Sequence, residues 1–392
     1  MRILQIISSM DPAKGGPPNV VARLAAAQAS LGHQVQVLTY GDSNARERLL
    51  VDTARVPGHS QVAYHYLPLP NRLQQLVSKT ALHKCRELIP YVDVVHIHGL
   101  WETLVRYASH CARIYSIPYV IAPHGMLDPW SLSQKSWKKS VALALGYRQM
   151  LNQASLLHAL NQDELALLQP LGIKAPAAVI PNGVEPGEVY PLPPKGTFRN
   201  TLPELEDRPF ILFLSRLHYK KGLDYLADAF KIIAAQHSDV HLVVAGPDGG
   251  AQAEFESMIQ QSGLTDRVHL VGSIYGERKL AAYVDATLFC LPSRQEGFSI
   301  AITEAMACGT PVVISRQCHF PEVAERGAGI VVELSAQTVA DAVLKLLQDA
   351  DQLSRASEAG KRLVEERFLW SKVAELTTMH YNRLLEKKTR IS

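Results

Sequence analysis

Two glutamates, Glu296 and Glu304, stand eight residues apart in a nearly uncharged segment, LPSRQEGFSIAITEAMACGTPVV. Two nearby carboxylates can act as an acid and a base, as they do in glycoside hydrolases. Upstream, Arg216 and Lys221 stand five residues apart in FLSRLHYKKGLDYL, directly after an apolar run. Two cations at a strand end and a helix N-terminus can hold a diphosphate and neutralise charge on a leaving phosphate. A solvated basic loop is the alternative interpretation of that pair.

Two glycine-rich loops also follow apolar runs. In SSMDPAKGGPPNVV, Gly15 and Gly16 permit close backbone approach, and the helix predicted to follow offers N–H groups to an anion. In VVAGPDGG, Gly246 opens either a simple turn or a backbone path for a nucleotide. The first loop lacks the GxGxxG fingerprint, so we do not expect NAD(P) binding.

Histidines follow or end two further apolar runs. His96 and His98, in VVHIHGLWE, share one face of a strand. A metal pair would need a third ligand, and none is evident, so hydrogen-bonded structural histidines are the favoured interpretation. His124 follows the run VIAP, as polar filler or as a hydrogen-bond partner for a substrate. The DAD triplet at 349–351 lies in a helical, surface-like pattern and is rejected as a metal site.

These residues must be positioned by strands, because each motif follows a run rich in Val, Ile and Leu. The runs form two series of about six: RILQIIS, QVQVLTY, VDVVHIHG, PYVIAPHG, SLLHAL and AAVIP, then FILFLSR, VHLVVAG, RVHLVG, ATLFCLPS, TPVVIS and GIVVE. Continuous apolar runs indicate parallel strands buried on both faces, and helical patterns lie between them. The sequence therefore predicts two doubly wound α/β domains, 1–184 and 185–369, joined by the Pro- and Gly-rich linker 181–200. Ligands of such sheets bind at the carboxyl ends of the strands, so we expect a shared interdomain cleft.

The composition sets outer limits on the function. The net charge of +3 is too small to argue for nucleic acid, but residues 1–184 carry 17 basic and 10 acidic side chains while the remainder carries 23 and 27. Five scattered cysteines without CxxC spacing indicate free thiols in a reducing cytosol. No apolar run reaches about 18 residues, and MRILQIISSM lacks the features of a signal peptide, so a cytoplasmic protein is expected.

A basic segment, QKSWKKSVALALGYRQM at 134–150, falls in a stretch that lacks acidic residues from Pro129 to Gln162. Lysines and an arginine interleaved with Trp137, Leu143 and Tyr147 suit an anionic membrane surface or a lipid-phosphate acceptor. A solvated surface helix is the alternative. The expectation is peripheral contact with the inner face of a membrane.

The chain resembles a retaining glycosyltransferase of family 4 in the GT-B superfamily, through motifs in that family's order: Glu296-x7-Glu304, the RLxxxKG pattern of Arg216 and Lys221, Gly15-Gly16, and His124. The likeness covers essentially the full chain. The segment HGLW…PHGMLDPW…KK is similar to enzymes that build exopolysaccharide and related surface glycans. The resemblance implies two Rossmann-like domains facing a cleft, with the helix at about 370–392 crossing back to the N-terminal domain.

The resemblance also implies roles for individual residues. Arg216 and Lys221 would grip the donor diphosphate, Glu304 would hydrogen-bond the nucleotide ribose, and Glu296 would contact sugar hydroxyls. His124 would lie beside the donor sugar, near the reaction centre. The donor-binding set is completed by Gly15, Gly16, Gly246, Gly297, Phe298, Ser299 and Ile300. No metal or other cofactor is implied.

The implied reaction is transfer from a nucleotide sugar, UDP-glucose first, to a growing lipid-linked polysaccharide. UDP-N-acetylglucosamine and GDP-mannose remain alternative donors. A GT-B epimerase acting on UDP-sugars is a rival that would isomerise the sugar without releasing nucleoside diphosphate. A non-catalytic nucleotide-sugar-binding protein is a second rival, but passive binding would not require both Arg216 and Lys221.

Overall fold

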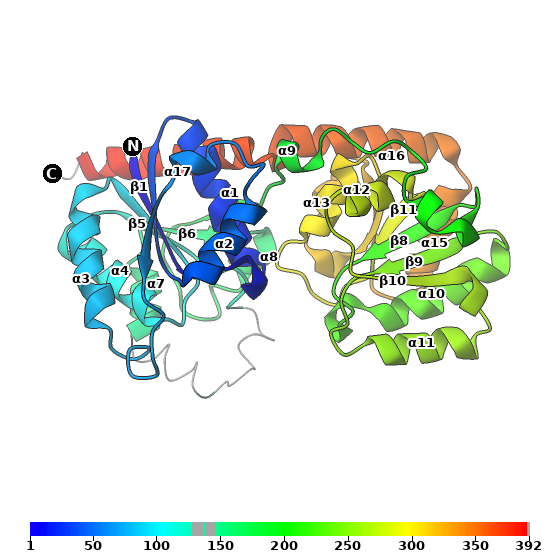
Figure 1. Cartoon of the computed structure of the whole chain (residues 1–392), viewed down its shortest axis with the longest axis horizontal. Helices are drawn as coiled ribbons and strands as arrows, with labels where there is room; N and C mark the ends of the chain where they lie inside the picture. Colours follow the sequence, from blue (N-terminus) through cyan, green and yellow to red (C-terminus); the bar gives the residue numbers. More distant parts are fainter. Residues whose placement is uncertain (128–136, 138–145, 390–392) are drawn as a thin grey trace. The chain divides into compact units, whose positions relative to one another are not determined.

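The structure, a computed structural model, describes residues 1–127, 137 and 146–389, which fall into two compact units (Figure 1). Unit 1 comprises Met1–Gly187 and the stretch from Trp370 onward, and unit 2 is Glu188–Leu369. The division predicted between residues 184 and 185 lies three residues from this boundary. Each unit is an α/β body with its own sheet.

The described strands of unit 1 form one parallel sheet in the order β3-β2-β1-β4-β5-β6-β7. The strands are β1 (Arg2–Ser9), β2 (Gln34–Tyr40), β3 (Ala63–Leu67), β4 (Val94–His98), β5 (Tyr119–Ala122), β6 (Leu156–Ala159) and β7 (Ala177–Val179). The sequence predicted about six strands and missed β3. This strand, AYHYL, lies at the sheet edge and is only partly buried, so it lacks the continuous apolar run that identified the others.

Helices cover both faces of this sheet. They are α1 (Gly16–Ser30), α2 (Ser43–Asp52), α3 (Lys79–Leu88), α4 (Thr103–Ile114), α7 (Arg148–Asn152), α8 (Gln162–Ala166) and α17 (Trp370–Thr389). The last of these follows unit 2 in the sequence and packs against α1 through Trp370, Val373 and Ala374. The N–H of Trp370 donates to the carbonyl of Val184 at 3.1 Å, so the returning chain is tied to unit 1 where it arrives.

The described strands of unit 2 form a second parallel sheet in the order β10-β9-β8-β11-β12-β13. They are β8 (Phe210–Leu214), β9 (His241–Ala245), β10 (Val268–Gly272), β11 (Leu288–Leu291), β12 (Val312–Ser315) and β13 (Gly329–Val332). The helices are α10 (Leu223–Gln236), α11 (Gln252–Gln261), α12 (Gly276–Asp285), α13 (Ile300–Ala307), α14 (Glu322–Glu325), α15 (Ala336–Leu347) and α16 (Ala350–Leu363), and the short α9 (Pro186–Val189) spans the boundary between the units in the sequence. Both units thus contain a parallel sheet with helices between its strands, which confirms the predicted α/β fold class.

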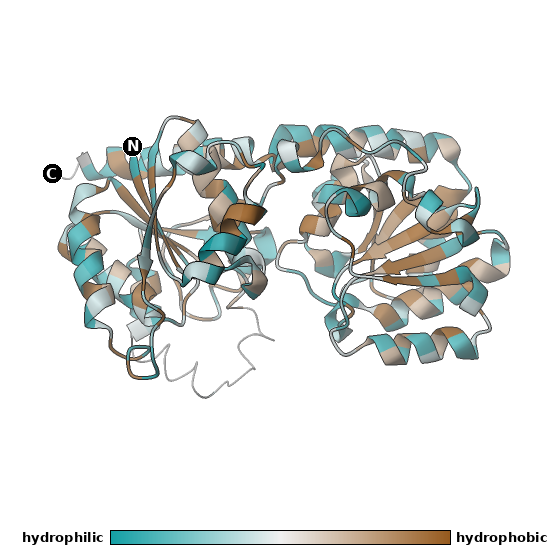
Figure 2. Ribbon diagram, viewed as in Figure 1, coloured by the Kyte–Doolittle hydropathy of each residue, from teal (hydrophilic) through white to brown (hydrophobic). Residues whose placement is uncertain are grey.

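The apolar residues concentrate in the strands, while the outer faces of the helices are hydrophilic (Figure 2). Strands β4, β5, β6, β9, β11 and β12 are buried at every position. This is the pattern expected of parallel sheets covered on both faces. The polar ends of the strands are therefore the places where a ligand can meet these sheets.

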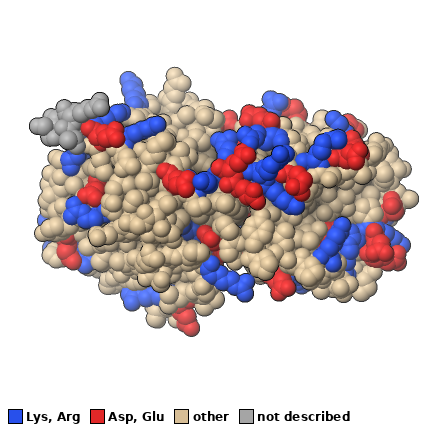
Figure 3. Space-filling model, turned by 90° about the horizontal axis from the view of Figure 1, so that it is seen from above, with Lys and Arg blue, Asp and Glu red and all other residues tan. Residues whose placement is uncertain are grey.

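Acidic and basic side chains are interspersed on the face seen in Figure 3. Among the described residues, acidic and basic side chains also pair one helical turn apart, as Glu358 and Lys361 do on α16 and Lys372 and Glu375 do on α17. Exposed pairs of this kind contribute about 0–1 kcal/mol, so they mark solvated helix surface. Within the described part of the chain, no helix combines the length and apolarity needed to cross a membrane. All five cysteines are buried and unpaired.

The interior of unit 1 also contains polar side chains. His96, His98 and His158 lie in strands β4 and β6 and are at most 1% exposed. Burial lowers the pKa of His158 to about 4, and it holds the pKa values of His96 and His98 well below the usual range. These rings are therefore neutral at pH 7.

We predict that unit 1 loses stability as the pH falls below about 6.5, the ordinary histidine pKa. Below that pH the histidines of the unfolded chain bind protons, whereas the buried rings of the folded protein bind them only when the pH approaches their lowered pKa. The unfolded state is therefore favoured as the pH falls. For His158 alone the loss is on the order of 2 kcal/mol between about pH 6.5 and about pH 5. All four tryptophans belong to unit 1, so urea unfolding followed by tryptophan fluorescence isolates this unit. A urea midpoint that stays constant across this range would contradict the prediction.

Candidate functional site

The strand order of unit 2 brings two distant segments together. Strands β8 and β11 are neighbours at the centre of the sheet, and their connections lead to opposite sides of it. This is the switch point at which doubly wound sheets open to ligands. The loop after β8 carries Arg216 and Lys221, and the loop after β11 carries Glu296. Residues far apart in the sequence therefore meet at the carboxyl ends of two central strands, which we call the carboxyl edge of the sheet.

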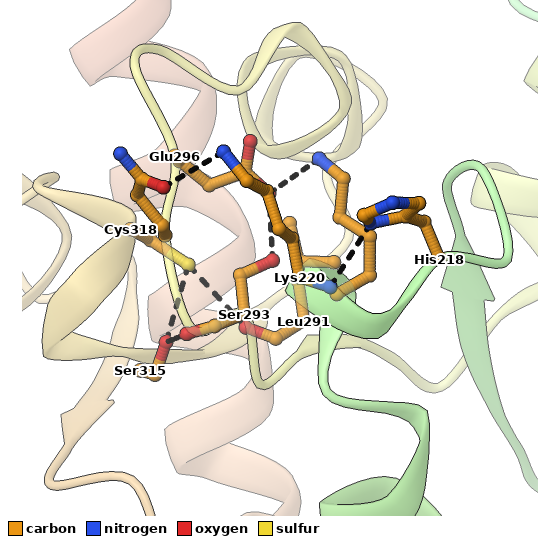
Figure 4. A network of polar contacts seen from close by, with 9 residues as sticks. His218, Lys220, Leu291, Ser293, Glu296, Ser315 and Cys318 are labelled. Atoms are coloured by element: carbon orange, nitrogen blue, oxygen red, sulfur yellow. Dashed lines mark hydrogen bonds and ion pairs between the residues drawn. The ribbon is translucent and has the colours of Figure 1, made fainter. Parts of the chain in front are cut away.

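Lys221 and Glu296 form an ion pair at the carboxyl ends of these strands, and Figure 4 shows Glu296 with its neighbour Ser293. The Lys221 Nζ donates to Glu296 Oε1 at 2.6 Å, and the Ser293 hydroxyl donates to the same oxygen at 2.6 Å. The Glu296 side chain is 8% exposed and that of Lys221 is 21% exposed. The neighbouring Lys220 points instead to the amide oxygen of Gln295, at 2.8 Å. The site thus holds one lysine against one carboxylate, partly shielded from water.

Backbone contacts fix this pair in place. The N–H of Glu296 donates to the carbonyl of Gln317, and the Ser315 hydroxyl donates to the carbonyl of Ser293. Cys318 lies beside them, and its thiol contacts Ser315 at 3.5 Å. Burial, and after it the charge of Glu296, raises the pKa of Cys318 to about 12. The thiol is therefore neutral and packs in the core, and it cannot serve as a nucleophile at pH 7.

Glycines let the strand-end loops approach one another. Gly222 has a φ of +69°, and a Cβ there would lie 1.9 Å from the carbonyl oxygen of Pro292. Gly246 has a φ of +143°, and a Cβ there would lie 1.9 Å from the carbonyl oxygen of Ser215. The Arg216 side chain is exposed, with its stem beside Gly249. The structure thus places Arg216 and Gly246 in adjoining loops at the same edge.

The segment Gly297–Ile300 leads from Glu296 into helix α13. Gly297 is exposed, Phe298 and Ile300 are partly buried, and Ser299 is the N-cap residue without a side-chain cap. The first-turn N–H groups of α13 are therefore open to another acceptor. The ring of Phe298 packs edge-on against that of Phe320, with ring centres 5.3 Å apart, which anchors the loop.

Glu304 lies on α13, and Lys279 of α12 donates to it at 2.5 Å. The hydroxyl of Tyr283 donates to the second carboxylate oxygen at 3.4 Å. Burial, with the charge of Glu304, holds the pKa of Tyr283 well above its usual value, so this hydroxyl keeps its proton. Glu296 and Glu304 thus have separate cationic partners and are not a coupled acid and base.

In unit 1, His124 follows β5 with a φ of +52°, a left-handed conformation that is uncommon for a residue with a side chain. Gly125 continues in the same region, and its N–H donates to the buried carboxylate of Glu164 at 2.7 Å. The other Glu164 oxygen accepts from the N–H of Leu160 at 2.6 Å. The His124 ring contacts His98, with Nε2 to Nδ1 at 2.9 Å. His124 is therefore a strained residue at a strand end, fixed through its ring by His98 and through the next peptide N–H by Glu164. Such a residue is a functional candidate.

Gly15 and Gly16 lie in the loop after β1. Gly15 has a φ of +116°, whereas a Cβ on Gly16 would meet open space. Asp11 anchors the loop, because Arg48 on α2 donates to its two oxygens at 2.8 and 2.7 Å. These hydrogen bonds lower the pKa of Asp11.

The residues weighed as metal ligands have other partners in the structure. His96 and His98 are hydrogen-bonded within the core of unit 1, and no group of three His, Cys, Asp or Glu able to hold a metal occurs among the described residues. Asp349, the first residue of the DAD triplet, caps α16 by accepting from the N–H of Gln352. The basic segment 134–150 lies largely outside the described residues.

Four residues that hydrogen-bond the predicted site residues or their loops were not predicted from the sequence: Ser293, Lys279, Glu164 and Arg48. Glu164 carried a local signal, because Asn161 and Glu164 have the spacing of a capping box, and Asn161 does accept from the N–H of Glu164. Lys279 and Arg48 reach their carboxylates only through tertiary packing. No spacing in the sequence announces such partners.

Two family models divide the chain between them. The glycosyl transferase 4-like domain matches residues 15–183, and the glycosyl transferases group 1 model matches residues 194–363. The GDP-mannose-dependent alpha-(1-6)-phosphatidylinositol monomannoside mannosyltransferase of Mycobacterium tuberculosis is 30% identical over 389 residues, which are 95% of this chain and 96% of that protein. The phosphatidylinositol N-acetylglucosaminyltransferase subunit of Homo sapiens is 26% identical over 381 residues, 95% of this chain and 74% of that protein.

Solved structures agree with the fold. The crystal structure of Anabaena HepE in complex with UDP matches with a TM-score of 0.77 and 20% identity, covering 98% of this chain and 100% of that one. Sucrose-phosphate synthase from Thermosynechococcus elongatus matches with a TM-score of 0.72 and 22% identity, covering 99% and 100%. With the relative that is 30% identical over nearly the whole chain, these matches show that the chain belongs to the glycosyltransferases, in family 4 of the GT-B superfamily.

Proposed function

We propose that this enzyme transfers glucose from UDP-glucose to a lipid-linked glycan, with retention at the anomeric carbon and without a metal. The observation that carries the proposal is the cluster at the switch point of unit 2. There Lys221, Arg216, Glu296 and the open end of α13 lie at one sheet edge, and Glu304 lies farther along α13. Cations suit a diphosphate, and carboxylates suit the hydroxyls of a sugar and a ribose.

The charges of the cluster match the reaction. As the bond from the anomeric carbon to the β-phosphate oxygen breaks, negative charge grows on the leaving diphosphate. Lys221 and Arg216 are placed to stabilise that charge as it develops, which is worth more than uniform binding of the substrate. Glu296 accepts hydrogen bonds from sugar hydroxyls, and Glu304 accepts them from the ribose.

Retention is proposed to proceed on one face of the sugar. The acceptor hydroxyl oxygen bonds to the anomeric carbon from the side that the diphosphate leaves, and its proton passes to the leaving phosphate oxygen. The products are UDP and the glycoside. The contacts of Glu296 support this proposal over nucleophilic attack by a carboxylate, because one of its oxygens already accepts from both Lys221 and Ser293.

The donor and acceptor assignments draw support from related proteins. Anabaena HepE was solved with UDP-glucose. The relatives from M. tuberculosis and Homo sapiens are both named for phosphatidylinositol-based acceptors, which supports a lipid-anchored acceptor here. The M. tuberculosis relative is named as GDP-mannose-dependent, so mannosyl transfer from GDP-mannose is the second candidate.

A donor panel tests the proposal. The full chain is incubated with UDP-glucose, UDP-N-acetylglucosamine and GDP-mannose in separate reactions, each with and without EDTA. Thermal shift and slow release of nucleoside diphosphate are then measured. We expect UDP release from UDP-glucose to be fastest and unaffected by EDTA. Faster GDP release from GDP-mannose would support the second candidate, and an isomerised nucleotide sugar without diphosphate release would refute transfer altogether.

We predict that Lys221→Ala and Arg216→Ala each lower kcat by at least about 10²-fold, as loss of one preorganised donor to a developing charge does. Steady-state kinetics with the preferred donor measure the loss. Lys220→Ala is the matched control. It removes the same charge from the neighbouring position, where the lysine side chain points to Gln295 and not to Glu296. Near-normal turnover in both variants, or an equal loss in Lys220→Ala, would argue against the assigned roles.

We predict that Glu296→Gln separates binding of UDP from transfer of the sugar. The substitution removes a negative charge 2.6 Å from Lys221, so the ammonium becomes fully available to a diphosphate. UDP alone should therefore bind at least as tightly as to the wild type, while kcat for transfer falls by about 10²-fold or more. Isothermal titration with UDP and transfer kinetics measure the two effects. Weakened UDP binding together with unfolding would indicate a purely structural role for Glu296.

A further inference from the structure

We propose that His98, Gln5 and Tyr381 are positioning residues for His124, because they belong to a one-way chain of hydrogen bonds that fixes which nitrogen of His124 carries its proton. The inference deepens the proposed function and rests on it. The chain has seven hydrogen bonds and passes in order through His124, His98, Gln5, Gln28, Tyr381, His96, His158 and the backbone carbonyl of Ile180.

The direction of the chain is set at its far end. The carbonyl of Ile180 can only accept, so the Nε2–H of His158 donates to it, at 2.7 Å. A neutral imidazole has one donor and one acceptor, so Nδ1 of His158 accepts from Nε2–H of His96, at 3.3 Å. By the same logic Nδ1 of His96 accepts, and the hydroxyl of Tyr381 donates to it at 2.6 Å. Each ring thus dictates the tautomer of the next.

The same direction continues to His124. The Tyr381 hydroxyl has given its proton to His96, so its oxygen accepts from the amide of Gln28 at 3.4 Å. The Gln28 amide oxygen accepts from the Gln5 amide at 2.7 Å, and the Gln5 amide oxygen accepts from Nε2–H of His98 at 2.7 Å. Nδ1 of His98 therefore accepts from Nε2–H of His124 at 2.9 Å. His124 is left with an unprotonated Nδ1.

Burial prevents the hydrogen bonds of this chain from reversing their direction. The side chains between the two ends are at most 1% exposed: Gln5, Gln28, His96, His98, His158 and Tyr381. Reversing any one of them would set two donors or two acceptors face to face, at a cost that water cannot relieve. Burial also keeps the rings neutral, as the pKa of His158 at about 4 indicates.

As a consequence, Nδ1 of His124 can accept a hydrogen bond but cannot donate one. Its Nδ1 presents a lone pair, so the ring accepts a hydrogen bond from a hydroxyl. It cannot donate to a phosphate oxygen from that atom. In the proposed reaction the ring therefore recognises a hydroxyl group and not a phosphate oxygen.

The control over His124 reaches into α17. Tyr381 is fully buried, and its hydroxyl joins the two halves of the chain of hydrogen bonds. Tyr381→Phe keeps the ring and removes only that hydroxyl. Gln28, Gln5, His98 and His124 then lose the fixed acceptor at their end and can reverse together.

The first test reads the tautomer directly in the full chain labelled with ¹⁵N-histidine. Long-range ¹H–¹⁵N spectra distinguish Nε2–H from Nδ1–H rings, and His124→Gln assigns the signal. We expect Nε2–H for His124 in the wild type and a second, Nδ1–H form in Tyr381→Phe. Tyr119→Phe is the matched control: it removes another buried tyrosine hydroxyl of unit 1, one that donates to the carbonyl of Met150. It should leave the His124 signal unchanged.

The second test asks whether the tautomer matters for transfer. Tyr381→Phe should lower kcat about tenfold, a fraction of the 10²–10⁴ contributed by a proton-handling side chain, with donor KM within about twofold. His98→Gln should retain most activity, because its amide can accept from His124 and donate to Gln5 in the same direction. His98→Leu can do neither and should lose it.

An identical His124 tautomer in the wild type and Tyr381→Phe would overturn the inference, as would equal kcat in Tyr381→Phe and Tyr119→Phe. The spectra do not depend on catalysis. A wild-type protein that transfers no sugar would refute the proposed function, while the tautomer result would still decide whether the chain of hydrogen bonds sets His124.

Discussion

Both sheets are buried on both faces, and the rest of the structure follows from that constraint. A parallel strand covered on both sides is largely apolar, and the polar side chains inside it, such as His96 and Gln5, are hydrogen-bonded to other buried groups. Polar groups that can meet a ligand therefore gather at the strand ends. Lys221, Glu296 and His124 all lie in segments that follow such ends. In unit 2 the reversal of strand order between β8 and β11 brings together two loops that are far apart in the sequence.

Two of the carboxylates near these ends are paired with lysines. Lys221 lies against Glu296, and Lys279 lies against Glu304. Removing such charges from water is costly, and an opposite charge at hydrogen-bond distance offsets much of that cost. The side chains are thereby held in place, and in the proposed function the donor would exchange partners with groups that are already oriented. Preorganisation of this kind is what makes electrostatic stabilisation effective in enzymes.

The sequence was sufficient to predict the fold class, because continuous apolar runs report burial on both faces directly. Strand β3 was not predicted, because a partly buried edge strand such as AYHYL has no continuous apolar run. Arg216, Lys221, Glu296 and Glu304 were predicted as site residues from spacing together with a family resemblance. Lys279 could not be found that way, since its contact with Glu304 depends on how α12 packs beside α13. His96 and His98 were correctly expected to be hydrogen-bonded, but their partner Tyr381 lies 285 residues from His96.

Helix α17 has a consequence for how the protein is made. Unit 1 is discontinuous, because its core includes Trp370 and Tyr381, which follow the whole of unit 2 in the sequence. At about 5–20 residues per second, translation of the 182 intervening residues, Glu188–Leu369, takes roughly 10–40 s. During that time the N-terminal part has left the ribosome while the interior surface that α17 covers is open. Unit 2, which is continuous, can fold first, so unit 1 is completed last although its first segment is translated before unit 2.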